Sequence, residues 1–162
     1  MKPLRTALLL LIAFFLQPAA VKLISWGGAG PNLLLCFTVF LVLTAREPAP
    51  VIGLCTAAAA VQEMCFSLYT GPGTAAIFTV GITAVLAGNF FTVESPAFLA
   101  GLIAAETLLH SGVLWVVRHI LGAPYRFLHV LSLQPFYILY NLAIMALLYF
   151  IFFKKAEGRY SL

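Results

Sequence analysis

The sequence has 162 residues, of which 63% are hydrophobic and only 9% are charged, and its mean hydropathy is +1.07. A soluble domain carries about 25% charged residues, so this chain has too little polar surface to coat a globule in water. The composition excludes a soluble globular protein, and the formal net charge of +4 indicates membrane topology rather than nucleic-acid binding, because the basic residues gather at the ends and in loops.

Six apolar runs follow one another along the chain, and a membrane span needs about 20 apolar residues. The first run resembles a signal peptide, with Lys2 and Arg5 before it. Its apolar character resumes beyond Pro18, so we expect it to be retained as a span. The sequence predicts a single all-α membrane domain over residues 1–162, with transmembrane helices at residues 6–24, 32–45, 50–68, 74–91, 96–117 and 134–153. The stretches between them are shorter than the roughly 50 residues that an independent domain needs.

The basic residues indicate the orientation of these six spans. An even number of spans places both ends of the chain on one side of the membrane. The segments on that side hold Lys2, Arg5, Arg46, Lys154, Lys155 and Arg159, whereas the opposite loops hold Lys22, Arg118 and Arg126. By the positive-inside rule we expect both termini to be cytoplasmic.

The longest predicted connection, residues 118–134, mixes basic residues with aromatic ones. Arg118, His119, Arg126 and His129 alternate there with Tyr125 and Phe127. This composition is typical of a segment that lies in the headgroup region. Its role is either simple anchoring at the interface or docking of a partner's domain.

Ionisable side chains within an apolar run normally face the bundle interior, because the bilayer penalises charge. Glu63 lies deep in the third run, and Glu106 and His110 lie four positions apart on one face of the fifth. Zinc requires three or four protein ligands, so we expect no metal and no other cofactor here. The open roles are an internal hydrogen bond, a proton relay or a substrate contact. Glu63 and Glu106 could also meet across helices.

Neutral polar and small residues predict how the helices pack. The amides expected in the bundle interior are Gln17, Asn32, Gln134 and Asn141, where such side chains hydrogen-bond between helices. Ala97, Gly101 and Ala105 recur at every fourth position of the fifth run, a spacing that allows close helix packing.

Catalytic motifs are missing from the sequence. It contains no phosphate-binding glycine loop before Lys-Ser/Thr, no Gly-x-Ser-x-Gly elbow and no His-Glu-x-x-His pair. We therefore expect a protein that is not an enzyme.

Three segments resemble the MreD family of rod shape-determining proteins. Residues Pro31 to Leu35 (PNLLL) are similar to the start of that family's second span. Glu63 to Gly73 resembles its acidic residue and turn between spans three and four, with Glu in place of the usual Asp. Pro135 to Leu142 (PFYILYNL) is similar to its Pro-x-x-x-Leu-Tyr-Asn-Leu pattern in the last span.

This resemblance implies a non-enzymatic scaffold of the bacterial elongation (rod) complex in the inner membrane. Such a scaffold binds the single-span protein MreC. Through MreC it is linked to RodA and its class B penicillin-binding transpeptidase partner, and so helps to organise lateral peptidoglycan synthesis and cell shape. Membrane lipid is a further expected partner, and nucleic acid is not.

The alternative is the substrate-binding S subunit of an energy-coupling-factor vitamin transporter. Such S components also have six short helices, and the fold of the MreD family resembles theirs. Under this alternative, Glu63, Glu106, His110 and Asn141 would line an outward-facing pocket. A small intramembrane lipid enzyme, with Glu106 and His110 as acid and base, is a third hypothesis.

Overall fold

The computed structural model describes residues 3–90, 95–123 and 126–152, and within these ranges it contains six α-helices and no β-strand. The helices are α1 (Pro3–Ile24), α2 (Leu33–Thr44), α3 (Pro48–Phe66), α4 (Pro72–Phe90), α5 (Pro96–Ile120) and α6 (Phe127–Phe152). The prediction of an all-α protein is confirmed for the described residues.

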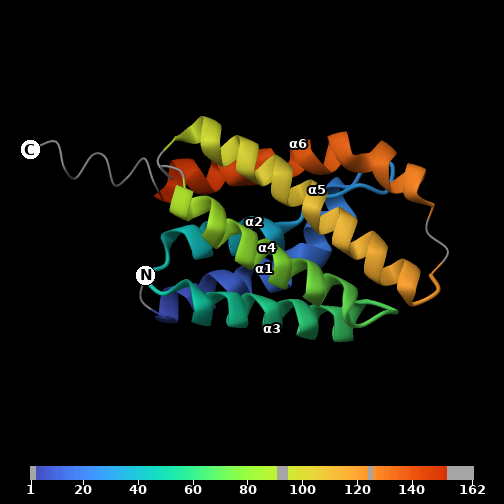
Figure 1. The fold of residues 1–162 in the computed structure, drawn as a ribbon, viewed down its shortest axis with the longest axis horizontal. Coiled ribbons are helices and arrows are strands. Elements are labelled where there is room, and N and C mark those ends of the chain that lie inside the picture. Colours follow the sequence, from blue (N-terminus) through green and yellow to red (C-terminus); the bar gives the residue numbers. More distant parts are fainter. Residues whose placement is uncertain (1–2, 91–94, 124–125, 153–162) are drawn as a thin grey trace, which may run out of the picture.

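Successive helices run in opposite directions along one bundle (Figure 1). At one end of the bundle α1, α3 and α5 finish and α2, α4 and α6 begin. We call this end the distal end. The opposite end, where α1 begins and α6 finishes, is the proximal end. The first and last helices therefore meet the same end of the bundle, as an even number of passes requires.

The second helix is the centre of the bundle. It contacts each of the other five helices, and its nine residues from Leu34 to Val42 are all buried. A helix that is apolar on every side is buried either in a protein core or in lipid, and here the neighbouring helices bury it. This enclosure explains why a sequence as short as LLLCFTVFLVLT forms a helix here.

Five of the six helices are long and apolar enough to cross a membrane, and α2 is the exception. Its 12 residues span about 18 Å, which is less than the roughly 30 Å of a hydrocarbon core. The chain is thus a multi-pass helical membrane protein, and α2, predicted as a short run over residues 32–45, is the one described helix below spanning length. Protein rather than lipid surrounds this helix, so its backbone ends need not reach the membrane surface.

The start of α6 also differs from the prediction. The helix begins at Phe127, seven residues before the predicted span, and Pro135 lies inside it. Most of the predicted interfacial connection is therefore helical, since Arg118 and His119 extend α5. A proline within a membrane helix is tolerated because neighbouring groups satisfy the backbone atoms that it frees.

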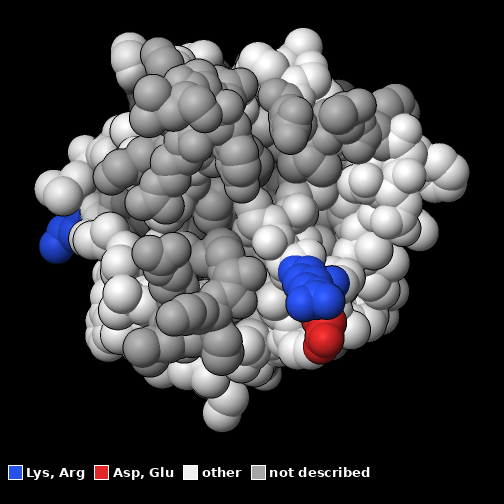
Figure 2. All heavy atoms as spheres, turned by 90° about the vertical axis from the view of Figure 1, so that its left-hand side faces the viewer, with Lys and Arg blue, Asp and Glu red and all other residues white. Residues whose placement is uncertain are grey.

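The surface of the bundle is that of a membrane protein. Long apolar side chains such as Phe15, Phe90 and Leu139 are exposed on the outer helices. Figure 2 views the proximal end, where charged side chains are sparse among the described residues. Apolar side chains thus face outward from the bundle, and it is the burial of polar side chains that needs an explanation.

Candidate functional site

Asn32 is the centre of a polar network at the distal end of the bundle. Its side-chain oxygen accepts a hydrogen bond from the backbone N–H of Leu35 at 3.0 Å and so caps the first turn of α2. Its own backbone N–H donates to Oδ1 of Asn141 on α6 at 2.9 Å. Its side-chain nitrogen donates to Nε2 of His110 on α5 at 3.3 Å. One residue thus joins α2 to α5 and α6.

Asn141 completes the link between α5 and α6. Its side-chain nitrogen donates to the hydroxyl of Thr107 at 3.0 Å, and the residue is only 1% exposed. Both ends of its amide are therefore used in contacts between helices. Its predicted place in the bundle interior agrees with this geometry.

Gln17 reaches from α1 to the segment that begins α2. Its amide nitrogen donates to the carbonyl of Pro31 at 2.9 Å, and its oxygen accepts from the backbone N–H of Leu33 at 2.6 Å. The first backbone N–H groups of a helix have no partner within the helix. Gln17 and Asn141 thus satisfy donors at the start of α2, in addition to the Asn32 cap.

Glu63 caps the next helix instead of meeting Glu106. Its two carboxylate oxygens accept from the backbone N–H groups of Gly71, Gly73 and Thr74 and from the Thr74 hydroxyl. The donors lie at the N-terminus of α4, where a carboxylate is stabilised by the unsatisfied N–H groups and by the helix dipole. The side chain thus fixes the turn between α3 and α4.

Glu106 and His110 are buried on α5, at 2% and 8% exposed, but they have different partners. A carboxylate oxygen of Glu106 accepts from the Thr83 hydroxyl on α4 at 2.9 Å, whereas His110 contacts Asn32. Each residue therefore joins α5 to another helix. No group of three or more His, Cys, Asp or Glu side chains suited to a metal ion occurs among the described residues.

Gln134 is buried as predicted, but it does not bond across helices in the described structure. Its amide nitrogen donates to the carbonyl of Val130, one turn earlier in α6. Its oxygen has no partner there. The early start of α6 explains the difference, because Gln134 lies inside this helix, where its own backbone offers the nearest acceptor.

Ala97, Gly101 and Ala105 all lie on an exposed face of α5. A Cβ atom placed on Gly101 would meet nothing within 4 Å. No described helix of this chain covers Gly101, so packing of this face against another helix stays a prediction. The close approaches involve other glycines, since a Cβ on Gly81 or Gly88 would lie 3.0 Å from Ile52 or Leu43.

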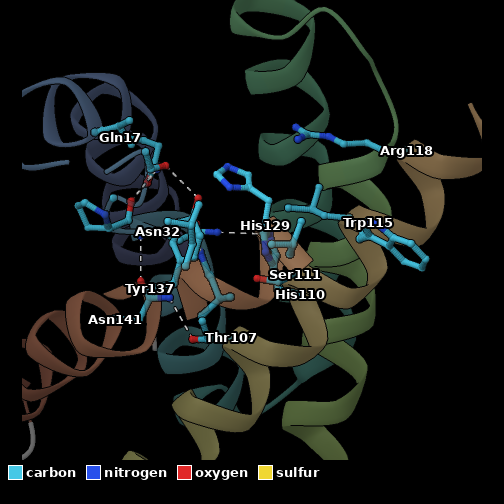
Figure 3. A pocket seen from close by; sticks show the side chains of 18 residues that line it. Gln17, Asn32, Thr107, His110, Ser111, Trp115, Arg118, His129, Tyr137 and Asn141 are labelled. Atoms are coloured by element: carbon cyan, nitrogen blue, oxygen red, sulfur yellow. Dashed lines mark hydrogen bonds between the residues drawn. The ribbon is translucent and has the colours of Figure 1, made fainter. Parts of the chain in front are cut away.

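A two-chambered hollow, which we call the distal cleft, opens beside this network. One chamber, of about 360 Å³, lies among α1, α2, α5 and α6 (Figure 3). The other, of about 520 Å³, lies among α1, α2, α3, α4 and α5. Both chambers share as lining residues Gln17, Val21, Asn32, His110, Leu114 and Arg118.

Several residues of this region were missed by the sequence reasoning. Thr83 and Thr107 supply the hydroxyl partners of Glu106 and Asn141. Tyr137 and Tyr140 donate to the carbonyls of Gly28 at 3.1 Å and Ile24 at 2.6 Å. A hydroxyl on an apolar helix has no distinctive spacing, although the tyrosines do belong to the PFYILYNL segment.

Comparisons of this chain with protein families, with characterised proteins and with solved structures find no match. The residues and their geometry are therefore the basis on which a function is assigned.

Proposed function

We propose that this chain is a membrane scaffold of the MreD type, which binds an MreC-like single-span protein in the bacterial inner membrane. Both termini are cytoplasmic in this proposal. Through that partner the scaffold would help RodA and its transpeptidase to insert peptidoglycan along the side wall. Two motifs support the proposal, Pro31–Leu35 and Pro135–Leu142. Asn32 lies in the first and Asn141 in the second, and the two residues are hydrogen-bonded to each other.

The observation that carries the proposal is how the buried and half-buried polar groups are used. Asn32, Asn141, Glu63, Glu106 and Gln17 all bond to other helices or to helix ends. These contacts stabilise one arrangement of the bundle, as interhelical hydrogen bonds do in membranes. A fixed arrangement of helices gives the bundle a fixed outer surface, and a scaffold needs such a surface to bind its partner.

The exposed small-residue face of α5 is the surface that we assign to the partner helix. Ala97, Gly101 and Ala105 let a second helix approach closely, since a small side chain at every fourth position leaves a shallow groove. Within the chain this groove is uncovered at Gly101. A single transmembrane helix of the partner would cover it.

Co-purification in detergent with the MreC-like protein of the same genome tests the proposal. We expect the unaltered chain to form a stable complex. Gly101→Leu should fold but lose it, because the larger side chain fills the groove. Gly53→Leu is the control: this glycine on α3 is also exposed, a Cβ atom placed on it would meet nothing within 4 Å, and its variant should retain the complex. A folded, monodisperse chain that captures no partner would contradict the scaffold.

The distal cleft favours a second candidate, the substrate-binding S subunit of an energy-coupling-factor transporter. Its chamber of about 360 Å³ falls within the range of about 300–1,000 Å³ of small-molecule sites. His110 and Asn141 line it, whereas Glu106 does not. Tight vitamin binding by purified protein, without an MreC-like partner, would support this alternative over the scaffold.

A further inference from the structure

The distal cleft combines a polar lining with a positive balance of fixed charges. Among its lining residues, Lys22 and Arg118 are cations and Glu63 is the only carboxylate. Arg118 lines both chambers, so its positive charge can attract an anion in either one. An arginine is a planar donor that pairs well with phosphate.

The one carboxylate of the cleft is already engaged. Glu63 accepts three backbone N–H groups and one hydroxyl at the start of α4. These four bonds direct its oxygens toward the turn at residues 71–74. The negative charge that would otherwise compete with a bound anion for Arg118 is therefore stabilised by the helix N-terminus.

Further donors surround the smaller chamber. Ser111, Trp115 and Arg118 of α5 and His129 of α6 line this chamber, and in Figure 3 the Trp115 ring points away from the other three. A hydroxyl, a guanidinium and an imidazole can all donate to an oxyanion. Apolar residues such as Leu114 and Leu133 complete the wall, which suits a ligand with an apolar part next to its charge.

We propose that the distal cleft binds a phosphate-bearing molecule, with Arg118 as its main cationic contact and His129 as a further donor. The phosphate comes either from the headgroup of a membrane lipid or from a soluble phosphate compound. This inference goes beyond the scaffold function and does not depend on it, since partner binding is assigned to a different surface, the exposed face of α5.

Fluorescence of Trp115 provides a direct test. The chain has two tryptophans, and Trp26 is 74% exposed, so Trp26→Phe leaves Trp115 as the only indole. This protein, in an uncharged detergent, is titrated with dihexanoylphosphatidylglycerol, with inorganic phosphate and with dihexanoylglycerol, which has the same tails but no phosphate. We expect a saturable change of emission with at least one phosphate probe and none with dihexanoylglycerol.

The source of the phosphate follows from the probes. A response to the phospholipid alone identifies a headgroup site, and a response to inorganic phosphate identifies a site for a soluble compound. Equal responses to the phospholipid and to dihexanoylglycerol would overturn the proposal, because the tails would then account for binding. So would the absence of a saturable response to both phosphate probes.

Two substitutions assign the contact. Arg118→Gln should weaken binding about tenfold or more, since hydrogen bonds to charged groups contribute most to such affinity. Arg126→Gln removes the same charge from an exposed residue near the distal end that does not line the cleft, and it should leave affinity unchanged. If Arg118→Gln does not fold, His129→Gln at an exposed position tests the same chamber and should weaken binding. Equal affinities of the folded cleft variants and Arg126→Gln would refute the assignment.

Discussion

The side-chain oxygen of Asn141 accepts a hydrogen bond from the backbone N–H of Asn32 at 2.9 Å, across 109 residues of sequence. The donor is one of the N–H groups at the start of α2 that have no acceptor within the helix. Because α2 contacts every other helix, this bond fixes the central helix against α6. The bundle is thus held together at its distal end by a helix start and an amide from a distant helix.

Asn141→Leu should therefore destabilise the protein. The change removes the bonds to the backbone N–H of Asn32 and to the hydroxyl of Thr107, and leaves both groups without this partner. We expect a loss of about 1–3 kcal/mol in the free energy of unfolding. Thermal unfolding in detergent measures it, with Asn89→Leu at an exposed position of α4 as the control. Equal unfolding midpoints of the two variants would show that the network does not stabilise the bundle.

Glu63 provides a graded test of the cap on α4. Glu63→Gln keeps one acceptor oxygen but loses the charge, whereas Glu63→Leu loses every bond of the carboxylate. The order of stability should be unaltered protein, then Gln, then Leu, with the charge itself contributing about 0.3–1 kcal/mol or more at a helix N-terminus.

Resistance to limited proteolysis at the turn between α3 and α4 should follow the same order, because the cap fixes residues 71–74. Glu47→Gln is the reference, since Glu47 precedes α3 without a side-chain capping bond. Should Glu63→Gln and Glu63→Leu be cleaved at the rate of the reference, the cap would have no stabilising role.

Gly73→Ala tests the same cap from the side of the turn. A Cβ on Gly73 would lie 2.9 Å from Oε1 of Glu63, too close for both to keep their places. We expect the carboxylate to move and the unfolding midpoint to fall. Gly53→Ala, at an exposed site with open space around it, should have a smaller effect. An unchanged midpoint of Gly73→Ala would mean that the carboxylate can shift without loss.

Much of the fold follows from the sequence, because long apolar runs separated by Gly and Pro permit little besides membrane helices. Residues 127–133 are the exception. They belong to the connection predicted at residues 118–134, whose basic and aromatic residues favour an interfacial segment, yet they form the first turns of α6. The length of the central helix also depends on its surroundings, since 12 residues suffice only when other helices enclose them.

The candidate site was less predictable for a geometric reason. Burial of Glu106, His110 and Asn141 follows from the membrane penalty for polar groups, but their partners depend on how each helix is rotated. Thr83 and Thr107 carry no pattern that selects them. Similarly, the spacing of Ala97, Gly101 and Ala105 indicates a face suited to packing, and it does not tell whether the packed helix belongs to the same chain.

Gly81 and Gly101 offer a comparison of a glycine inside the bundle with one on its surface. Gly81 is buried on α4, and a Cβ there would lie 3.0 Å from two atoms of Ile52 on α3. Gly81→Val should therefore overpack this interface and lower the free energy of unfolding by about 1–3 kcal/mol. Gly101→Val carries the same change of side chain in a helix, with nothing near it, so the difference between the two variants isolates packing from helix propensity. Thermal unfolding of the purified chain without a partner measures this difference. Equal midpoints would show that α3 and α4 can separate slightly at Gly81 without cost, and that their close approach is not what holds these two helices together.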